Sequence, residues 1–120
     1  MVFGFQRLEI YKLSKEIVKY NYKLTSRFPN GEKFCIVQQM NRAAISVSSN
    51  IAEGTSRNSN KEKVHFINIA YGSLMELVCQ MDISLDLGYI EESEYNKFIK
   101  MVKNLSVKMS NYIRAVMNNG

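Results

Sequence analysis

Residues that interrupt helices are scarce in this chain of 120 residues. The sequence contains one proline, Pro29, and six glycines, so long stretches can form helix without a break. No hydrophobic run approaches the roughly 20 residues that span a bilayer, and the first ten residues lack the layout of a signal peptide. We therefore expect a cytoplasmic protein without a membrane-spanning segment.

Residues that hold metals or perform catalysis are also few. Cys35 and Cys79 have no metal-ligand spacing and lie in apolar contexts, so we expect both to be buried free thiols. The only histidine, His65, forms one Glu-x-x-His motif with Glu62, whereas a di-metal bundle needs two such motifs and two further inward glutamates. Glycine-rich phosphate loops and Ser-His-Asp sets are not recognisable. The sequence predicts no catalytic residue, metal, cofactor or small-molecule substrate, and an enzyme is the last of the classes considered.

The chain instead has 46% apolar residues, which recur at steps of three and four along four segments. These segments are residues 7–28, 32–53, 60–87 and 91–116. Such spacing places the apolar side chains on one face of each helix. The predicted core rows include Ile10, Ile17, Leu24, Phe34, Met40, Val47, Ile51, Ile69, Leu74, Met81, Phe98, Val102, Leu105 and Met109.

Residues at the ends of these segments suit helix termini. Gly54 follows the second segment, where a left-handed C-terminal cap is common, and Gly88 follows the third segment and is expected to end it. Ser59 and Glu62 form a capping-box pattern before the third segment, and three glutamates at 91–94 begin the fourth. Short connections force neighbouring helices to be antiparallel. We predict an all-α fold, a single domain over residues 1–120 that is an antiparallel up-down-up-down four-helix bundle.

A second, polar line runs along the predicted second helix, roughly 135° away from its apolar row. This polar line is built mainly of amides and a hydroxyl, whereas solvated helix faces usually carry Lys and Glu. It could face water, another helix or a partner subunit, where short polar groups can be paired at little entropic cost. The polar line consists of Gln39, Arg42, Ser46, Asn50 and Glu53.

Positive charge gathers on the predicted first helix. The chain has 16 Lys and Arg against 11 Asp and Glu, and residues 1–29 alone carry six basic and two acidic groups. Five of these cations fall within an arc of about 120° that extends for about 22 Å. Such a line suits a phosphate backbone without reading base sequence, although any soluble helix can carry a charged outer face. The basic line consists of Lys12, Lys15, Lys19, Lys23 and Arg27.

Three strings in this order resemble the bacterial four-helix-bundle family named after proteins encoded in intervening sequences of 23S rRNA. They are FPNGEKF, QQMNRAAISVSSNIAEG and FINIAYGSLMELVCQMDISLDLGYI, and the resemblance covers about residues 5–100. Many members have proline at Ser48 and a basic residue at Asn41. The most specific matches are Arg42, Ala43, Ala44, Ser46, Asn50, Ile51, Ala52, Glu53 and Gly54, followed by Gly72, Ser73, Leu74 and Glu76.

The resemblance implies a non-enzymatic bundle that assembles into a ring-like homo-oligomer, commonly a pentamer. The accessory protein of diversity-generating retroelements looks like a distant relative of this family and binds nucleic acid. In such an assembly, Arg42, Glu53 and Glu76 would pair between helices or subunits. We therefore expect a homo-oligomer that associates with RNA or DNA through the basic line; the alternative is an oligomeric protein-interaction scaffold that binds no nucleic acid.

Overall fold

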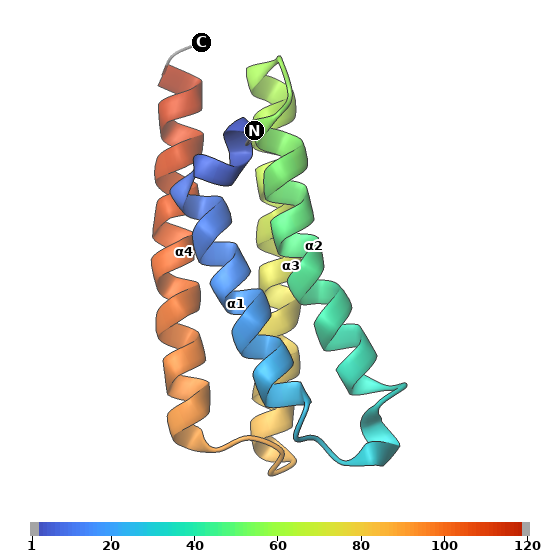
Figure 1. Cartoon of the computed structure of the whole chain (residues 1–120). Coiled ribbons are helices and arrows are strands. Elements are labelled where there is room, and N and C mark those ends of the chain that lie inside the picture. Colours follow the sequence, from blue (N-terminus) through green and yellow to red (C-terminus); the bar gives the residue numbers. More distant parts are fainter. Residues whose placement is uncertain (1–2, 119–120) are drawn as a thin grey trace.

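Four long α-helices make up most of the protein (Figure 1). The computed structural model describes residues 3–118, and within this range it contains no strand. Two short 3-10 helices, η1 and η2, precede α1 and α2. The elements are η1 Gly4–Arg7, α1 Glu9–Thr25, η2 Asn30–Glu32, α2 Ile36–Thr55, α3 Asn60–Asp86 and α4 Glu92–Asn118. The predicted all-α fold is confirmed.

Consecutive helices run in opposite directions, as the colours of Figure 1 show. Helix α2 packs against α1 and α3, and α4 packs against α3 and α1. The four helices therefore surround one core in chain order, which is the arrangement that short connections favour. No helix among residues 3–118 is long and apolar enough to cross a membrane.

The buried residues confirm most of the predicted apolar rows. One hydrophobic cluster combines side chains from all four helices, with Ile17, Met40, Leu74 and Phe98 almost completely buried. Two predicted members are wrong. Phe34 is 80% exposed because α2 begins only at Ile36, and Ile69 is 39% exposed. Ile67, which is fully buried, contributes to the core at this level of α3 instead.

The helix termini follow the sequence signals at both ends of α3. Gly88 has a φ of +77°, and the N–H of Tyr89 donates to the carbonyl oxygen of Ser84 at 2.9 Å, so α3 ends in a left-handed cap. At the start of α3, the Ser59 hydroxyl accepts a hydrogen bond from the Glu62 N–H at 3.1 Å. Helix α1 ends at Thr25, three residues earlier than predicted.

Gly54 does not cap α2, and that prediction is wrong. It lies inside the helix, which continues to Thr55, and it is buried. A Cβ atom at Gly54 would lie 2.7 Å from the Cβ of Phe66 and 3.2 Å from the carbonyl oxygen of Lys63. Gly54 therefore permits a close approach of α2 to α3 and serves packing rather than termination.

Polar side chains join α1 to α2 at the two positions that depart from the family pattern. The hydroxyl of Ser48 lies 2.8 Å from that of Ser14. The side-chain oxygen of Asn41 accepts hydrogen bonds from Asn21 at 2.7 Å and from Thr25 at 3.2 Å. Asn21 and Thr25 are buried, so Asn41 satisfies polar groups that would otherwise lose their hydrogen bonds to water.

Both cysteines are exposed, which contradicts the prediction of buried thiols. Cys35 lies in the turn before α2 and not on a helix that faces the core. Cys79 lies on the outward side of α3, between Val78 and Gln80, which are more buried. Apolar neighbours in the sequence did not indicate burial because α3 carries apolar residues on more than one face.

Candidate assembly face and basic surface

The polar line lies along the side of α2 that adjoins α3. The hydroxyl of Ser46 lies 2.8 Å from that of Ser73 on α3. Asn50 donates from its side-chain nitrogen to the carbonyl oxygen of Ser46 at 2.8 Å and to the Ser46 hydroxyl at 3.1 Å. Ser46, Asn50 and Ser73 are half-buried. The middle of the polar line thus forms part of the contact between α2 and α3.

The charged residues of this region and Gln39 remain on the surface. Gln39, Arg42, Glu53 and Glu76 are all exposed. Glu53 forms an ion pair with Arg57, one turn further along the chain. Within residues 3–118, the side chain of Arg42 makes neither a hydrogen bond nor an ion pair. Folding of a single chain therefore leaves Arg42 without a partner.

Arg42 and Glu76 lie at the same level of the α2–α3 contact. Arg42 is one turn before Ser46, and Glu76 is one turn after Ser73. Because the two helices are antiparallel, these two turns extend in the same direction from the Ser46–Ser73 contact. Glu76 accepts only a long hydrogen bond, 3.4 Å, from the Gln80 side chain. An acid and a base with unused hydrogen-bonding capacity therefore share this surface.

The outer side of α3 carries a row that the sequence analysis missed. Its members are spaced alternately by four and three residues, the spacing at which one helix packs along another. Gly72 lies in the middle, and a Cβ there would meet nothing within 4 Å. We call this row the outer α3 row: Ile69, Gly72, Glu76, Cys79 and Ile83, all exposed.

The outer α3 row had a signal in the sequence. Ile69, Cys79 and Ile83 form a second apolar row on roughly the opposite side of α3 from the buried row of Ile67, Leu74 and Met81. A helix that is apolar on more than one side needs more than one partner. Together, the polar line and the outer α3 row form what we call the α2–α3 face.

The basic line lies on the outside of α1. Lys12, Lys15, Lys19 and Lys23 are exposed along the helix. Lys19 lies 3.0 Å from Glu16, but both side chains are largely exposed, and such pairs are weak. The ammonium group of Lys15 lies over the ring of Tyr11, 5.3 Å from its centroid. These four lysines can reach an external anion.

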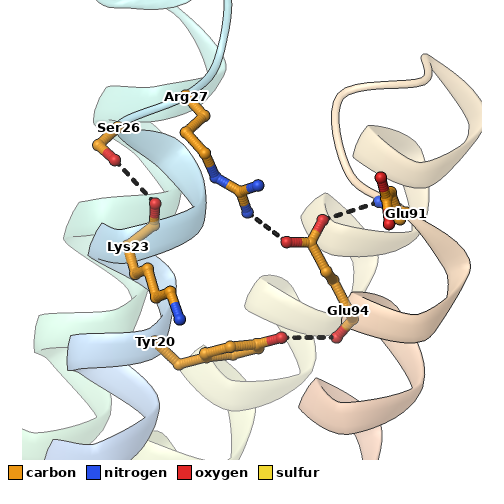
Figure 2. A network of polar contacts seen from close by, with 6 residues as sticks. All are labelled: Tyr20, Lys23, Ser26, Arg27, Glu91 and Glu94. Carbon is orange, nitrogen blue, oxygen red and sulfur yellow. Dashed lines mark hydrogen bonds and ion pairs between the residues drawn. The ribbon is translucent and has the colours of Figure 1, made fainter.

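Arg27 is separated from the other four because it lies beyond the end of α1. Its guanidinium forms an ion pair with Glu94 at the start of α4 (Figure 2). Glu94 also accepts a hydrogen bond from the Glu91 N–H at 2.9 Å. This hydrogen bond and the adjacent Arg27 lower the pKa of the Glu94 carboxyl below its ordinary value. Arg27 thus holds α1 to α4 and is less available to an external phosphate.

Helix α4 brings two further lysines to the side of α1. The ammonium group of Lys97 lies over the Tyr20 ring, 4.9 Å from its centroid. Burial is the main cause that raises the pKa of the Tyr20 hydroxyl, with the negative charge of Glu94 second. Lys108 lies 3.1 Å from Glu9 near the other end of α1. The sequence did not reveal these neighbours, because lysines on α4 join the basic line only through the packing of α4 on α1.

The residues considered as metal ligands do not converge. Within residues 3–118, no three His, Cys, Asp or Glu side chains come together in a way that could hold a metal ion. His65 is exposed, and its ring lies edge-on to Phe66 with 5.5 Å between centroids.

Comparisons with known proteins agree with this architecture. The sequence profile of the 23S rRNA-intervening sequence protein family matches residues 6–111. A solved structure from Bacteroides thetaiotaomicron, described as a protein of unknown function from the S23 ribosomal protein family, superposes with a TM-score of 0.79. The two chains share 20% identity over 87% of this chain and 97% of the other, a likeness that shows the fold alone. No curated protein is significantly similar in sequence. From the match over residues 6–111, the chain belongs to the 23S rRNA-intervening sequence protein family.

Proposed function

We propose that this protein is a non-enzymatic subunit that assembles with identical copies through the α2–α3 face and binds nucleic acid through the basic line. The observation that carries the proposal is the surface position of several residues from the motifs most specific to the family. Ala44, Ile51 and Leu74 from these motifs are buried in the core. Arg42 and Glu76 from the same motifs are exposed, and the fold of one chain does not require them.

A second copy supplies what the α2–α3 face lacks. The polar-line side of α2 in a second copy would cover the exposed Ile69 and Ile83 of the outer α3 row and pack closely at Gly72, which offers no side chain to obstruct a neighbour. Arg42 of one copy would pair with Glu76 of another. Because two different patches of the α2–α3 face meet in this contact, it can repeat head to tail around a ring, with five subunits as the expected number, and leave neither patch unpaired.

Paired substitutions test this assembly. An ion pair at a dry contact adds little net stability, but removal of one partner typically costs about 3–5 kcal/mol because the other charge remains unpaired. Arg42→Ala and Glu76→Ala should therefore each reduce the assembled mass in light scattering more than the double substitution Arg42→Leu with Glu76→Leu. Arg114→Ala is the matched control, since Arg114 is exposed on α4. Single variants that assemble like the unmodified protein would reject the proposed contact.

Nucleic-acid binding rests on the four exposed lysines of the basic line together with Lys97. Repetition of this surface around a ring multiplies the positive field without any further residue. Filter binding at about 50 mM salt should detect RNA or DNA, with an affinity that falls steeply as salt rises. Absence of binding to either nucleic acid at this salt concentration would reject this part of the proposal.

One observation favours a scaffold that binds no nucleic acid. Lys19, Arg27 and Lys108 each lie next to a carboxylate, which reduces the positive charge available to phosphates. The two functions can be separated by the absorbance ratio of protein purified at low and at high salt. Nucleic acid that co-purifies only at low salt supports binding, whereas a protein-like ratio in both preparations, with assembly intact, supports the scaffold.

A further inference from the structure

An apolar groove of about 450 Å³ lies between α1 and α2, beside the basic line. Its volume is in the range of about 300–1,000 Å³ that is usual for small-molecule sites. Tyr11 and Val18 form the α1 wall, and Ile45, which is 46% exposed, forms part of the α2 wall. Ser49 and Ala52 leave space because their side chains are short.

The end of the groove carries aromatic rings. Helix η1 places Phe5 edge-on against Tyr11, with 4.9 Å between ring centroids and 80° between planes. Phe3 stacks on Phe5 at 6.1 Å and is itself 64% exposed. An exposed ring beside a groove lined by further rings provides a surface on which another planar aromatic group can stack.

Two members of the basic line also line the groove. Lys15 and Lys19 both contribute to its wall, and Lys15 lies over the Tyr11 ring. The site thus combines aromatic and apolar surface with positive charge at its edge. Its ligand should be planar and weakly polar in one part and anionic in the adjoining part.

We propose that this groove takes an unpaired base of a single-stranded nucleic acid, while Lys15 and Lys19 hold the phosphates on either side of that base. This inference rests on the proposed nucleic-acid binding and specifies which form of nucleic acid is bound. Proteins that bind single strands combine aromatic surfaces for bases with a positive surface for the backbone. In a duplex the bases are paired and stacked, so only the phosphates can contact the basic line. The groove therefore gives a preference for single strands that is tolerant of sequence.

The test compares oligouridine RNA of about 12 nucleotides, carrying one central 2-aminopurine, with an RNA duplex of equal length. The unmodified protein should bind the single strand at least about 5-fold more tightly than the duplex, and binding should change the 2-aminopurine fluorescence. Ser49→Phe fills the groove from an exposed position and should abolish both the preference and the fluorescence change. Ser110→Phe, at an exposed position on α4, is the matched control and should preserve both.

Tyr11→Leu provides a second variant, because it keeps an apolar side chain in the wall and removes the ring. It should also lower single-strand affinity and leave duplex affinity unchanged. Equal affinity for both forms, without a fluorescence change, would overturn the inference while the proposed nucleic-acid binding stands. Absence of binding to either form would overturn both. Loss of assembled mass in Ser49→Phe, with no effect on RNA, would identify a second copy of the chain as the occupant and overturn the inference.

Discussion

At the scale of single residues, Gly54 decides how closely α2 approaches α3. Gly54→Ala places a methyl group 2.7 Å from the Cβ of Phe66, and an atom attached directly to the backbone cannot move away without a shift of the helix. Overpacking of this kind costs about 1–3 kcal/mol, so the variant should lose that much unfolding free energy in urea denaturation. Gly31→Ala, with nothing within 4 Å of the new Cβ, should change stability by less than about 0.5 kcal/mol. Equal stability of both variants would contradict the close approach.

Glu94 gives the protein a pH-dependent contribution to stability. Its folded-state pKa lies below the ordinary glutamate value of 4.5, because the Glu91 N–H and the Arg27 guanidinium favour the ionised carboxylate. A lowered pKa stabilises the fold fully above the unfolded-state value, and this stabilisation is lost as pH falls through the folded-state value. The advantage of the unmodified protein over Glu94→Gln in urea denaturation should therefore be largest near neutral pH and decrease below pH 4.5.

Arg27→Gln isolates one of these two causes. It removes the ion pair with Glu94 but leaves the hydrogen bond from Glu91. In the Arg27→Gln background, the stability that Glu94 adds over Glu94→Gln should therefore fall less at low pH, but it should still fall. A stability difference between Glu94→Gln and the unmodified protein that does not vary with pH would show that the carboxylate charge contributes nothing to the fold.

At the scale of elements, the assembly that we propose depends most on the outer side of α3. Gly72→Arg places a long charged side chain in the middle of the outer α3 row, where the single chain has open space. The variant should fold with helix content like that of the unmodified protein in circular dichroism, and its mass in light scattering should fall toward that of one chain. Asn96→Arg, at an exposed position on α4, should keep the assembled mass. Full assembly of Gly72→Arg would exclude the outer α3 row from the contact.

Helix α1 carries the surface that we propose binds nucleic acid, and its lysines should act through phosphates. Lys12→Gln should weaken RNA and DNA binding to a similar extent. It should reduce the slope of the logarithm of affinity against the logarithm of salt concentration by about 0.7–0.9 if Lys12 contacts one phosphate. Lys61→Gln makes the same charge change at an exposed position at the start of α3, outside the basic line, and should leave the slope unchanged. Identical slopes for the two variants would mean that the net charge of the protein drives binding.

At the scale of the whole molecule, hydrophobic spacing was enough to predict four helices, their order and most of the core. Each helix has a row such as Ile10, Ile17 and Leu24 that requires cover, and short connections leave few arrangements. Spacing was not enough at the helix ends. Phe34 continues the apolar rhythm of α2, but the turn that follows η2 ends only at Cys35. Gly54 has the residue type of a cap but serves a close contact, because packing overrode the local preference.

The α2–α3 face, the surroundings of the basic line and the groove between α1 and α2 could not be predicted without the structure. The polar line could be read from one helix, whereas its position beside the outer α3 row depends on the packing of α2 against α3. In the same way, the spacing of lysines along α1 predicted the basic line, but only tertiary contacts bring Lys97 next to Tyr20 and Arg27 next to Glu94. The apolar groove between α1 and α2 depends on η1 folding back so that Phe5 reaches Tyr11. A helical pattern in the sequence carries no information about contacts between residues that lie far apart along the chain.

The central claim is that the α2–α3 face joins identical chains, and the mass of the protein in solution tests it most directly. Light scattering coupled to size-exclusion chromatography should give a multiple of the 13.9 kDa chain, with five copies expected. A well-folded protein that retains the mass of one chain at high concentration would contradict the claim, because Arg42, Gly72 and Glu76 would then face only water.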